Sequence, residues 1–509
     1  MSRSRALPSP MRVWLTAMAL LSPMVAAEDR PPSTFLEKTK AHLGLVLKEG
    51  TDRYGAKFTP LWMSSIDTRT GRYPEDDTRH PDYPSRVYRL IAAPKGSNPY
   101  WDLPQMAAAA DLSKRTGDPS YRKGTDDCLD FVFSHLTDGP SGLLLWGNHY
   151  YYHAYLDEIL FFLDEKNVTP YGKNPTGSDA KYHEARPVPI PWDLLWERSP
   201  EKTERYIRAM LDRHLTDPAT GEFNRHATAR GQQHAFIESG GLLVHAAAFL
   251  FSKTKDPALL ERADLFIRYT LAARNPDTGL VSNCPNSPTK RWDHSISTTE
   301  IGLWAGSLIA ASAYVPADTR DAWLGHADRV TSAWLKYAWS AKDRKFHGNL
   351  RITDGVPVVE RTTVYQPGAF TSLWEPQFPN HDYPMAMAET CLRLHKITGK
   401  EIYRTACQRW ITVIRESLPA REGKGGYAEH YGRVIHFLLG CHRDQKDPAS
   451  LDLAKQVATE ADLFLWAGKA FRSHPLENRC DSVDGMGYLL LALGWLESGK
   501  EPDYHGFFF

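Results

Sequence analysis

The sequence predicts an all-α protein in which helical hairpins close into an α/α toroid, with short β-hairpins in its loops. Two observations predict this fold. Helix-start signals recur along the chain, and amphipathic helices alternate with helices that are apolar nearly all round. Counting helix pairs from Ser33 onward gives six or seven hairpins.

The helix starts share a short turn that contains Pro or Gly. Asp118-Pro119, Asp256-Pro257 and Asp447-Pro448 each precede a helical run, as do Ser199-Pro200 and Gly399-Lys400. An Asp or Ser side chain caps the free N–H groups of a helix, and Pro fits its first position. These turns therefore predict where successive helices begin.

The periodicity separates outer helices from inner ones. In residues 258–273, Leu259, Ala263, Phe266 and Ile267 form one apolar stripe, and charged residues fill much of the opposite side. Residues 240–251 and 487–496 are apolar nearly all round, as expected for inner helices that are buried on both sides.

The first 27 residues have the pattern of a secretory signal peptide. Arg3, Arg5 and Arg12 precede an apolar run over residues 13–25, and small residues follow it. That run is too short to cross a bilayer, which takes about 20 residues. We therefore expect a secreted or periplasmic protein, without a membrane span, whose residues 28–509 form a single catalytic domain.

Composition excludes several classes of protein. The 509 residues carry 61 Lys+Arg and 61 Asp+Glu, and this balance gives no reason to expect a nucleic-acid partner. The six cysteines contain no C-x-x-C motif, so a cysteine zinc site or a thioredoxin-like centre is not expected. The 20 His and 15 Trp are the unusual counts, and aromatic residues in such number suit a large core or a sugar-binding cleft.

The histidines have a regular position. Four short segments that follow outer helices end in His149, His226, His347 and His474. If the hairpins are equivalent, these four side chains lie at one end of the ring.

Candidate metal ligands occur in three motifs. His149 and His153 are spaced i, i+4 and face one ion if their segment is helical, although the H-E-x-x-H signature of zinc proteases is absent. Asn224-Arg225-His226 places a cation beside an imidazole, and His183-Glu184 supplies a carboxylate. Each motif also has a structural interpretation, as locally satisfied core, capping or surface residues.

A further set of residues is expected to line a sugar-binding cleft. This set combines aromatic rings with cations and amides from several of the repeated segments, and the alternative for each is a buried polar cluster. Its members are Trp146, Asn224, Arg291, Trp292, His294 and Arg472.

At these motifs the chain resembles the α/α-toroid polysaccharide lyases, most closely the family 2 pectate lyases. The matching pieces are Trp146-Gly147-Asn148-His149, His183-Glu184 before the helix that contains Trp196, and Asn224-Arg225-His226 after Gly221. The resemblance implies cleavage of polygalacturonate, an acidic polysaccharide, by β-elimination with a divalent metal such as manganese. It implies that His149, Glu184 and His226 are the ligands, with His153 competing for the place of His149, and that Arg225 is the base.

β-Elimination explains these residue types. Removing the proton next to a uronate carboxylate places charge on that carboxylate, which a metal can take up, and a base must accept the proton. Arginine is almost always protonated, so Arg225 is either the base or a clamp for the carboxylate. In the second case Tyr152, Tyr150 or another His is the base.

Two other functions fit the same fold. A glycoside hydrolase would use two carboxylates about 6.5–9.5 Å apart if it inverts configuration. The candidates for that pair are Asp157, Glu158, Glu184, Glu300, Glu375 and Asp484. A carbohydrate-binding or scaffold protein is the third interpretation, because a fold does not determine a function.

Overall fold

The computed structural model describes residues 33–75, 93–147, 149–162, 168–171, 183–185, 188–228, 234–287, 294–359, 369–374, 383–418 and 425–509. The predicted signal peptide lies outside these residues.

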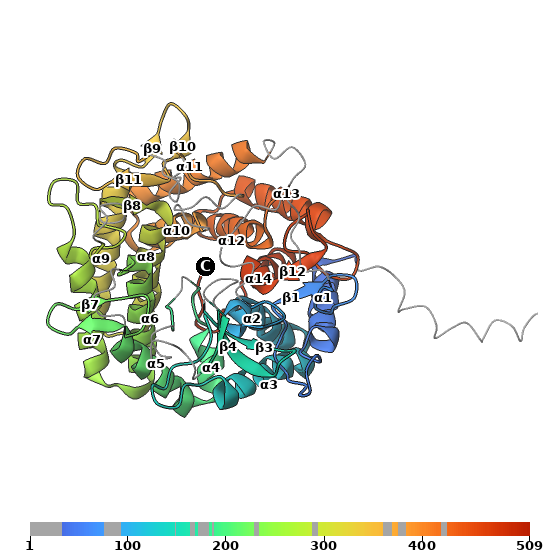
Figure 1. The fold of residues 1–509 in the computed structure, drawn as a ribbon. Coiled ribbons are helices and arrows are strands. Elements are labelled where there is room, and N and C mark those ends of the chain that lie inside the picture. The colour runs from blue at the N-terminus through green and yellow to red at the C-terminus, as the bar shows by residue number, and fades with distance from the viewer. Residues whose placement is uncertain are drawn as a thin grey trace, which may run out of the picture.

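The predicted all-α toroid is confirmed, and fourteen α-helices of the described residues alternate between an outer and an inner layer (Figure 1). The outer helices are α1 (Phe35–Glu49), α3 (Pro119–His135), α5 (Pro200–His214), α7 (Pro257–Ala272), α9 (Ala317–Leu335), α11 (Glu401–Ser417) and α13 (Pro448–Leu465). The inner helices are α2 (Pro99–Thr116), α4 (Trp192–Arg198), α6 (Ile237–Thr254), α8 (Thr298–Ala311), α10 (Met385–Thr398), α12 (Ala428–Gln445) and α14 (Met486–Ser498).

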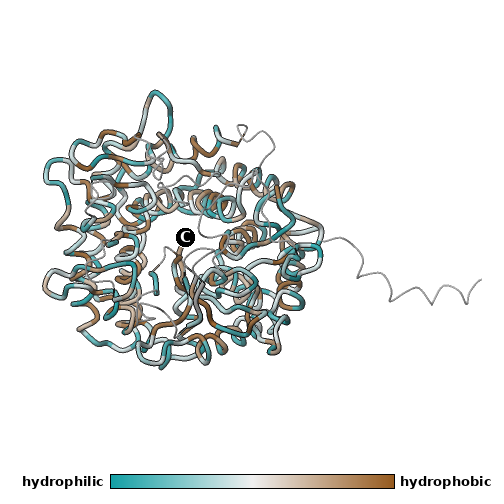
Figure 2. Tube along the Cα trace, viewed as in Figure 1, coloured by the Kyte–Doolittle hydropathy of each residue, from teal (hydrophilic) through white to brown (hydrophobic). Residues whose placement is uncertain are grey.

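Burial explains why the two layers differ in sequence. In α6, every residue from Ile237 to Leu250 is buried, whereas α7 buries a single stripe that includes Leu259, Ala263 and Phe266. Apolar residues accordingly follow the helices, and hydrophilic residues concentrate in the outer loops (Figure 2). In the described part of the chain, no helix is both long enough and apolar enough to cross a membrane.

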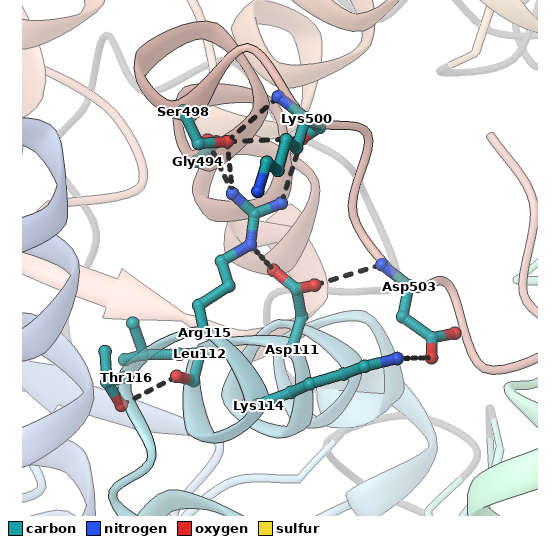
Figure 3. A network of polar contacts seen from close by, with 9 residues as sticks. All are labelled: Asp111, Leu112, Lys114, Arg115, Thr116, Gly494, Ser498, Lys500 and Asp503. Atoms are coloured by element: carbon teal, nitrogen blue, oxygen red, sulfur yellow. Dashed lines mark hydrogen bonds and ion pairs between the residues drawn. The ribbon is translucent and has the colours of Figure 1, made fainter.

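The ring closes where α2 meets α14, far apart in the sequence. Arg115 of α2 donates to the Gly494 carbonyl at 2.8 Å and to Ser498 Oγ at 2.6 Å (Figure 3). Its Nε donates to Asp111 Oδ2 at 2.5 Å, and Asp111 Oδ1 accepts the N–H of Asp503. One partly buried guanidinium thus connects the first inner helix with the last one and with the tail that follows it.

Short antiparallel strands form the loops at the N-terminal ends of the inner helices. The largest sheet has the order β2 (Gly96–Ser97), β3 (Tyr150–His153), β4 (Glu158–Phe162) and β5 (Val168–Pro170). Two-stranded pairs are formed by β1 (Ser65–Asp67) with β12 (Arg479–Asp481), β6 (Leu215–Asp217) with β7 (Glu222–Phe223), β8 (Ser295–Ser297) with β11 (Asn349–Arg351), and β9 (Trp339–Ser340) with β10 (Lys345–Phe346).

The residues after α14 turn into the centre of the ring (Figure 1). The Phe509 ring stacks on His436 of α12 at 3.7 Å, and the Phe508 ring meets His245 of α6 at 5.2 Å. His245 and His436 are each the ninth residue of their helix, about 12 Å along the axis from its N-terminal end. The tail therefore packs against the inner helices at the centre of the ring, and the loops lie at the N-terminal ends of these helices.

Candidate functional site

Two extended segments join at the loop end of the ring. Glu184 and His226 form an isolated antiparallel β-bridge, in which the N–H of Ala185 donates to the Arg225 carbonyl and the N–H of Ala227 donates to the His183 carbonyl. Gly221 begins the second segment with φ +81°, and a Cβ there would lie 2.4 Å from the Leu265 carbonyl oxygen, so only glycine fits this turn.

Three candidate metal ligands meet at this bridge. Glu184 Oε2 lies 3.6 Å from His149 Nε2, and Glu184 Oε1 lies 3.3 Å from His226 Nε2. A ligand atom of each residue lies within 4.8 Å of the other two. The Glu184 side chain is fully buried, whereas His149 and His226 are 14% and 17% exposed, so the cluster opens toward solvent through its imidazoles.

A guanidinium and a third imidazole border the cluster. Arg225 Nε lies 3.1 Å from Glu184 Oε1, and the Arg225 guanidinium covers the face of Phe236 at 4.8 Å. The His234 ring lies 5.7 Å from that of His226. Burial, reinforced by the Arg225 charge, lowers the pKa of His234 to about 4, so this imidazole is neutral near pH 7.

A buried chain of hydrogen bonds lies beneath the bridge. Trp146 Nε1 donates to the Tyr206 hydroxyl at 2.9 Å, and that hydroxyl lies 3.0 Å from His183 Nε2. His183 Nδ1 lies 2.8 Å from His214 Nε2, and His214 Nδ1 lies 2.8 Å from the Asn224 carbonyl. All five residues are essentially inaccessible to solvent.

The donors in this chain follow by elimination. The Asn224 carbonyl only accepts, so His214 Nδ1 carries a proton, and the neutral ring accepts at Nε2 from His183 Nδ1. His183 Nε2 then accepts the Tyr206 proton. Burial lowers the pKa of His214 to about 4 and that of His183 well below its ordinary value, which agrees with two neutral rings. The hydrogen bonds therefore all run in one direction, from Trp146 through Tyr206 and the two imidazoles to the extended segment that carries His226.

Residues 106–235 match the family model described as "Periplasmic pectate lyase". This segment is similar to the family 2 pectate lyases. The matched segment contains His149, Glu184, Arg225 and His226, so the resemblance and the cluster concern the same part of the toroid. The protein is accordingly a carbohydrate-active enzyme of the α/α-toroid type.

Several solved structures are also similar to the chain at low sequence identity. An α-1,6-mannanase of a Salegentibacter species is 11% identical, with a TM-score of 0.45 over 91% of this chain and 98% of that chain. A cellobiose 2-epimerase from Bacillus thermoamylovorans is 10% identical, with a TM-score of 0.45 over 90% and 97% of the two chains. An unsaturated glucuronyl hydrolase from a Bacillus species is 13% identical, with a TM-score of 0.44 over 79% and 98%.

The geometry separates His149 from His153, the other candidate for the second histidine ligand. Residues 150–153 form a strand and not a helix, so the i, i+4 spacing places His149 and His153 about 13 Å apart along the chain, too far to bind one ion. His153 pairs with Gly96 and Glu158 in the sheet, and its Nδ1 accepts the N–H of Leu156 at 3.2 Å. Only His149 of the two joins Glu184.

The expectation that Trp146 and Asn224 contact the substrate is corrected. Both side chains are completely buried. Trp146 donates to Tyr206 under the bridge, and Asn224 Oδ1 accepts the N–H of His226 at 2.9 Å. These two residues position the cluster from below and do not line a cleft.

The two tyrosines considered as bases are also corrected. Tyr150 is fully buried against Phe161. The Tyr152 hydroxyl donates to Asp157 Oδ1 at 3.2 Å at the far end of the hairpin, and burial together with the Asp157 charge raises its pKa. A phenol whose pKa is raised is a poor proton acceptor near neutral pH.

The other predicted cleft residues do not join the cluster. Arg472 donates to the Phe464 carbonyl at 2.9 Å and to Asn478 at 3.1 Å, so its guanidinium holds its own loop together. His294 is exposed at the start of β8, where its carbonyl accepts the N–H of Ile352. Arg291 and Trp292 lie outside the described residues.

The carboxylates considered for a hydrolase are dispersed. Asp157 accepts two backbone N–H groups at the hairpin tip, and Glu158 is exposed on β4. Glu300 and Asp484 are buried at the starts of α8 and α14. Glu184 belongs to the cluster, and Glu375 lies outside the described residues.

The four histidines of the repeated segments lie at the predicted end of the ring. The His347 carbonyl accepts from Thr298, the first residue of α8, and the His474 ring packs against Tyr427, which precedes α12. Among the described residues, only His149 and His226 of the four are neighbours, with ring centroids 5.7 Å apart.

Sequence reasoning missed His234 and the buried chain through Tyr206 and His214. A histidine three residues before an inner helix is a local signal that points to His234. No spacing rule connects Tyr206 of α5 with His183, because that contact exists only after the chain has folded.

Proposed function

We propose that this chain is an exported, divalent-metal-dependent lyase that cleaves an acidic, uronate-containing polysaccharide by β-elimination. The observation that carries the proposal is the convergence of His149, Glu184 and His226, with Arg225 beside them. The match to a family described as periplasmic pectate lyase supports both the reaction type and the export.

The donor set fits a divalent metal ion. Ligand atoms that share one ion at about 2.0–2.2 Å are at most about 4.4 Å apart. The separations of 3.6 and 3.3 Å from Glu184 to the two imidazoles satisfy this limit. His226 Nε2 is buried and makes no hydrogen bond of normal geometry with the described residues, although Glu184 Oε1 lies 3.3 Å away, and this arrangement suits two ligands of one ion. Two imidazoles and one carboxylate suit manganese and similar metals.

When bound, such an ion would take up negative charge on the uronate carboxylate. The remaining chemistry belongs to the chain. The Arg225 side chain is 25% exposed and is held by Glu184 and Phe236, so its guanidinium can clamp the substrate carboxylate or face the proton that is removed. With Tyr150 and Tyr152 directed elsewhere, the neutral His234 is the other imidazole placed to accept that proton.

The decisive test is the appearance of unsaturated uronate product. The protein, stripped with a chelator, is incubated with polygalacturonate with and without added Mn²⁺, and absorbance in the ultraviolet is followed. We expect activity only with metal and none in His226→Ala. His153→Ala is the matched control, because this histidine lies in the same hairpin outside the cluster, and it should remain active.

Three results would contradict the proposal. Full activity after thorough metal removal excludes the metal dependence. Reducing ends formed without unsaturated product indicate a hydrolase. Loss of activity in His153→Ala together with an active His226→Ala variant contradicts the ligand assignment.

A further inference from the structure

Exposed apolar side chains that the cluster around Glu184 does not use lie at the tip of the β3–β4 hairpin and in the segment around residue 57 that this tip contacts. Three such side chains are Phe58, which is 73% exposed, Leu156, which is 57% exposed, and Tyr155, which is 42% exposed. We call these three side chains the tip platform. Single exposed apolar residues are ordinary on protein surfaces, whereas a group of them marks a binding surface.

A carboxylate clamp joins the two segments of the platform. Asp157 Oδ2 accepts the N–H groups of Ala56 at 2.7 Å and Lys57 at 3.1 Å, and the Tyr152 hydroxyl donates to Oδ1. A Cβ on Gly55 would lie 2.4 Å from Asp157 Oδ1, so only glycine allows this close approach. Asp157 itself has φ +55°, a conformation that is uncommon outside glycine and often found at functional sites.

Other aromatic rings support Tyr155 from below. Its ring stacks on Tyr54 at 4.7 Å with an interplanar angle of 23°, and Tyr73 meets its edge at 6.4 Å. The Tyr54 hydroxyl accepts the N–H of Tyr73, and the Tyr73 hydroxyl accepts the N–H of Lys95. An exposed ring that is already immobilised loses little conformational entropy when a ligand stacks on it.

The platform is connected to the cluster by one strand. His149 immediately precedes β3, and Tyr155 follows its end by two residues, which places Tyr155 at most about 20 Å from His149. A polymer cleaved at the cluster is long enough to extend over this distance. The exposed Lys57 next to Phe58 supplies a positive charge of the sign that attracts uronate carboxylates.

We propose that the tip platform is a secondary binding surface on which sugar rings of the polysaccharide stack while another part of the same polysaccharide is cleaved at the cluster. A stable protein partner needs about 800 Å² on each side, which three side chains do not provide. A sugar ring, in contrast, covers one aromatic face. The acidic nature of the bound polysaccharide rests on the proposed function, and the stacking surface itself does not.

Kinetics on long and short substrates test the platform. Phe58→Ala/Tyr155→Ala should raise KM for polygalacturonate about tenfold, because two stacking faces are lost, and leave kcat unchanged. The constants for a trimer, which is too short to reach the platform, should not change. Leu463→Ala on α13 is the matched control, since Leu463 is 74% exposed outside the platform. An unchanged polymer KM, or an equal rise for polymer and trimer, overturns the proposal.

Binding without catalysis separates this inference from the proposed function. Electrophoresis in gels that contain acidic or neutral polysaccharides should show retardation of the wild type that is lost in the double variant. Asp157→Ala, which keeps the three platform side chains but removes the clamp, should show partial loss. Retardation by neutral polysaccharides alone contradicts the acidic substrate and leaves the platform intact. Equal retardation of wild type and double variant overturns the platform, as does self-association that the double variant abolishes.

Discussion

Replacing Tyr206 by Phe tests whether the buried hydrogen-bond chain positions the cluster. Tyr206 is 1% exposed, and Phe fills the same space without its hydroxyl. The change leaves Trp146 Nε1 without an acceptor and His183 Nε2 without a donor. Each buried unpaired group costs about 1–3 kcal/mol, so the free energy of unfolding should fall by about 2–6 kcal/mol. In a chain of this size that corresponds to about 2–6 °C in Tm.

The same substitution should also weaken metal binding. His183 is adjacent to Glu184, and His214 holds the strand that carries His226, so both ligands lose a constraint. Mutation of residues that hydrogen-bond to metal ligands, or that hold them in place, typically lowers metal affinity about tenfold or more. Titration of metal-free protein with Mn²⁺ in a calorimeter measures the affinity directly, and thermal melting of the same samples measures the stability.

Tyr403→Phe is the matched control. The Tyr403 hydroxyl is equally buried and donates to Asp328 at 2.7 Å, between α11 and α9. This variant should lose stability but keep its metal affinity. If Tyr206→Phe binds Mn²⁺ as tightly as the wild type, or if both variants lose the same affinity, the positioning role assigned to the chain is wrong.

Three further results are expected. At an Mn²⁺ concentration of 100 Kd, the metal should stabilise the wild type by about 2.7 kcal/mol. Glu184→Gln should abolish this stabilisation, because it removes the carboxylate of the cluster. A rise in Tm with Mn²⁺ that persists in the variant contradicts the role of Glu184 as a ligand. Burial lowers the pKa of His214 to about 4 and that of His245 to about 3, so below about pH 6.5 the unfolded chain binds more protons than the folded protein. The free energy of unfolding should therefore fall as the pH is lowered from about 6.5 to 4, by up to about 1.4 kcal/mol per pH unit for each histidine. His245→Leu should flatten this dependence in melting experiments, and an unchanged slope speaks against it. Arg115→Met should lower the free energy of unfolding by about 3 kcal/mol, because it removes the contacts that close the ring. Lys114→Met, at an exposed ion pair, is the control and should change this free energy by less than about 1 kcal/mol. Similar losses for both variants in denaturant titrations would refute the role of Arg115.

The helix starts were predictable because their causes are local. Asp118, Asp256 and Asp447 each accept the N–H of the residue two positions later, as the Asp-Pro motif predicts. The alternation of amphipathic and fully apolar helices likewise determined the two layers, because burial on one face or on both leaves its period in the sequence.

The site was predictable only in part. Family resemblance selected Glu184 and His226, and it left His149 and His153 as alternatives because their spacing suits a helix. The segment forms a strand, since β3 pairs with β2 on one side and β4 on the other, and His149, just before this strand, is the one of the two that lies at the cluster. Secondary structure in a short segment depends on such non-local partners.

By itself, then, the sequence determined the toroid and the residue types of the site, which depend on neighbours a few positions away. The tertiary structure decided the role of each side chain. It buried Trp146 and Asn224 under the bridge, turned the Tyr152 hydroxyl toward Asp157, and connected Tyr206 to His183. These contacts join segments whose hydrogen bonds and burial arise only when the ring closes, and no local pattern in the chain encodes them.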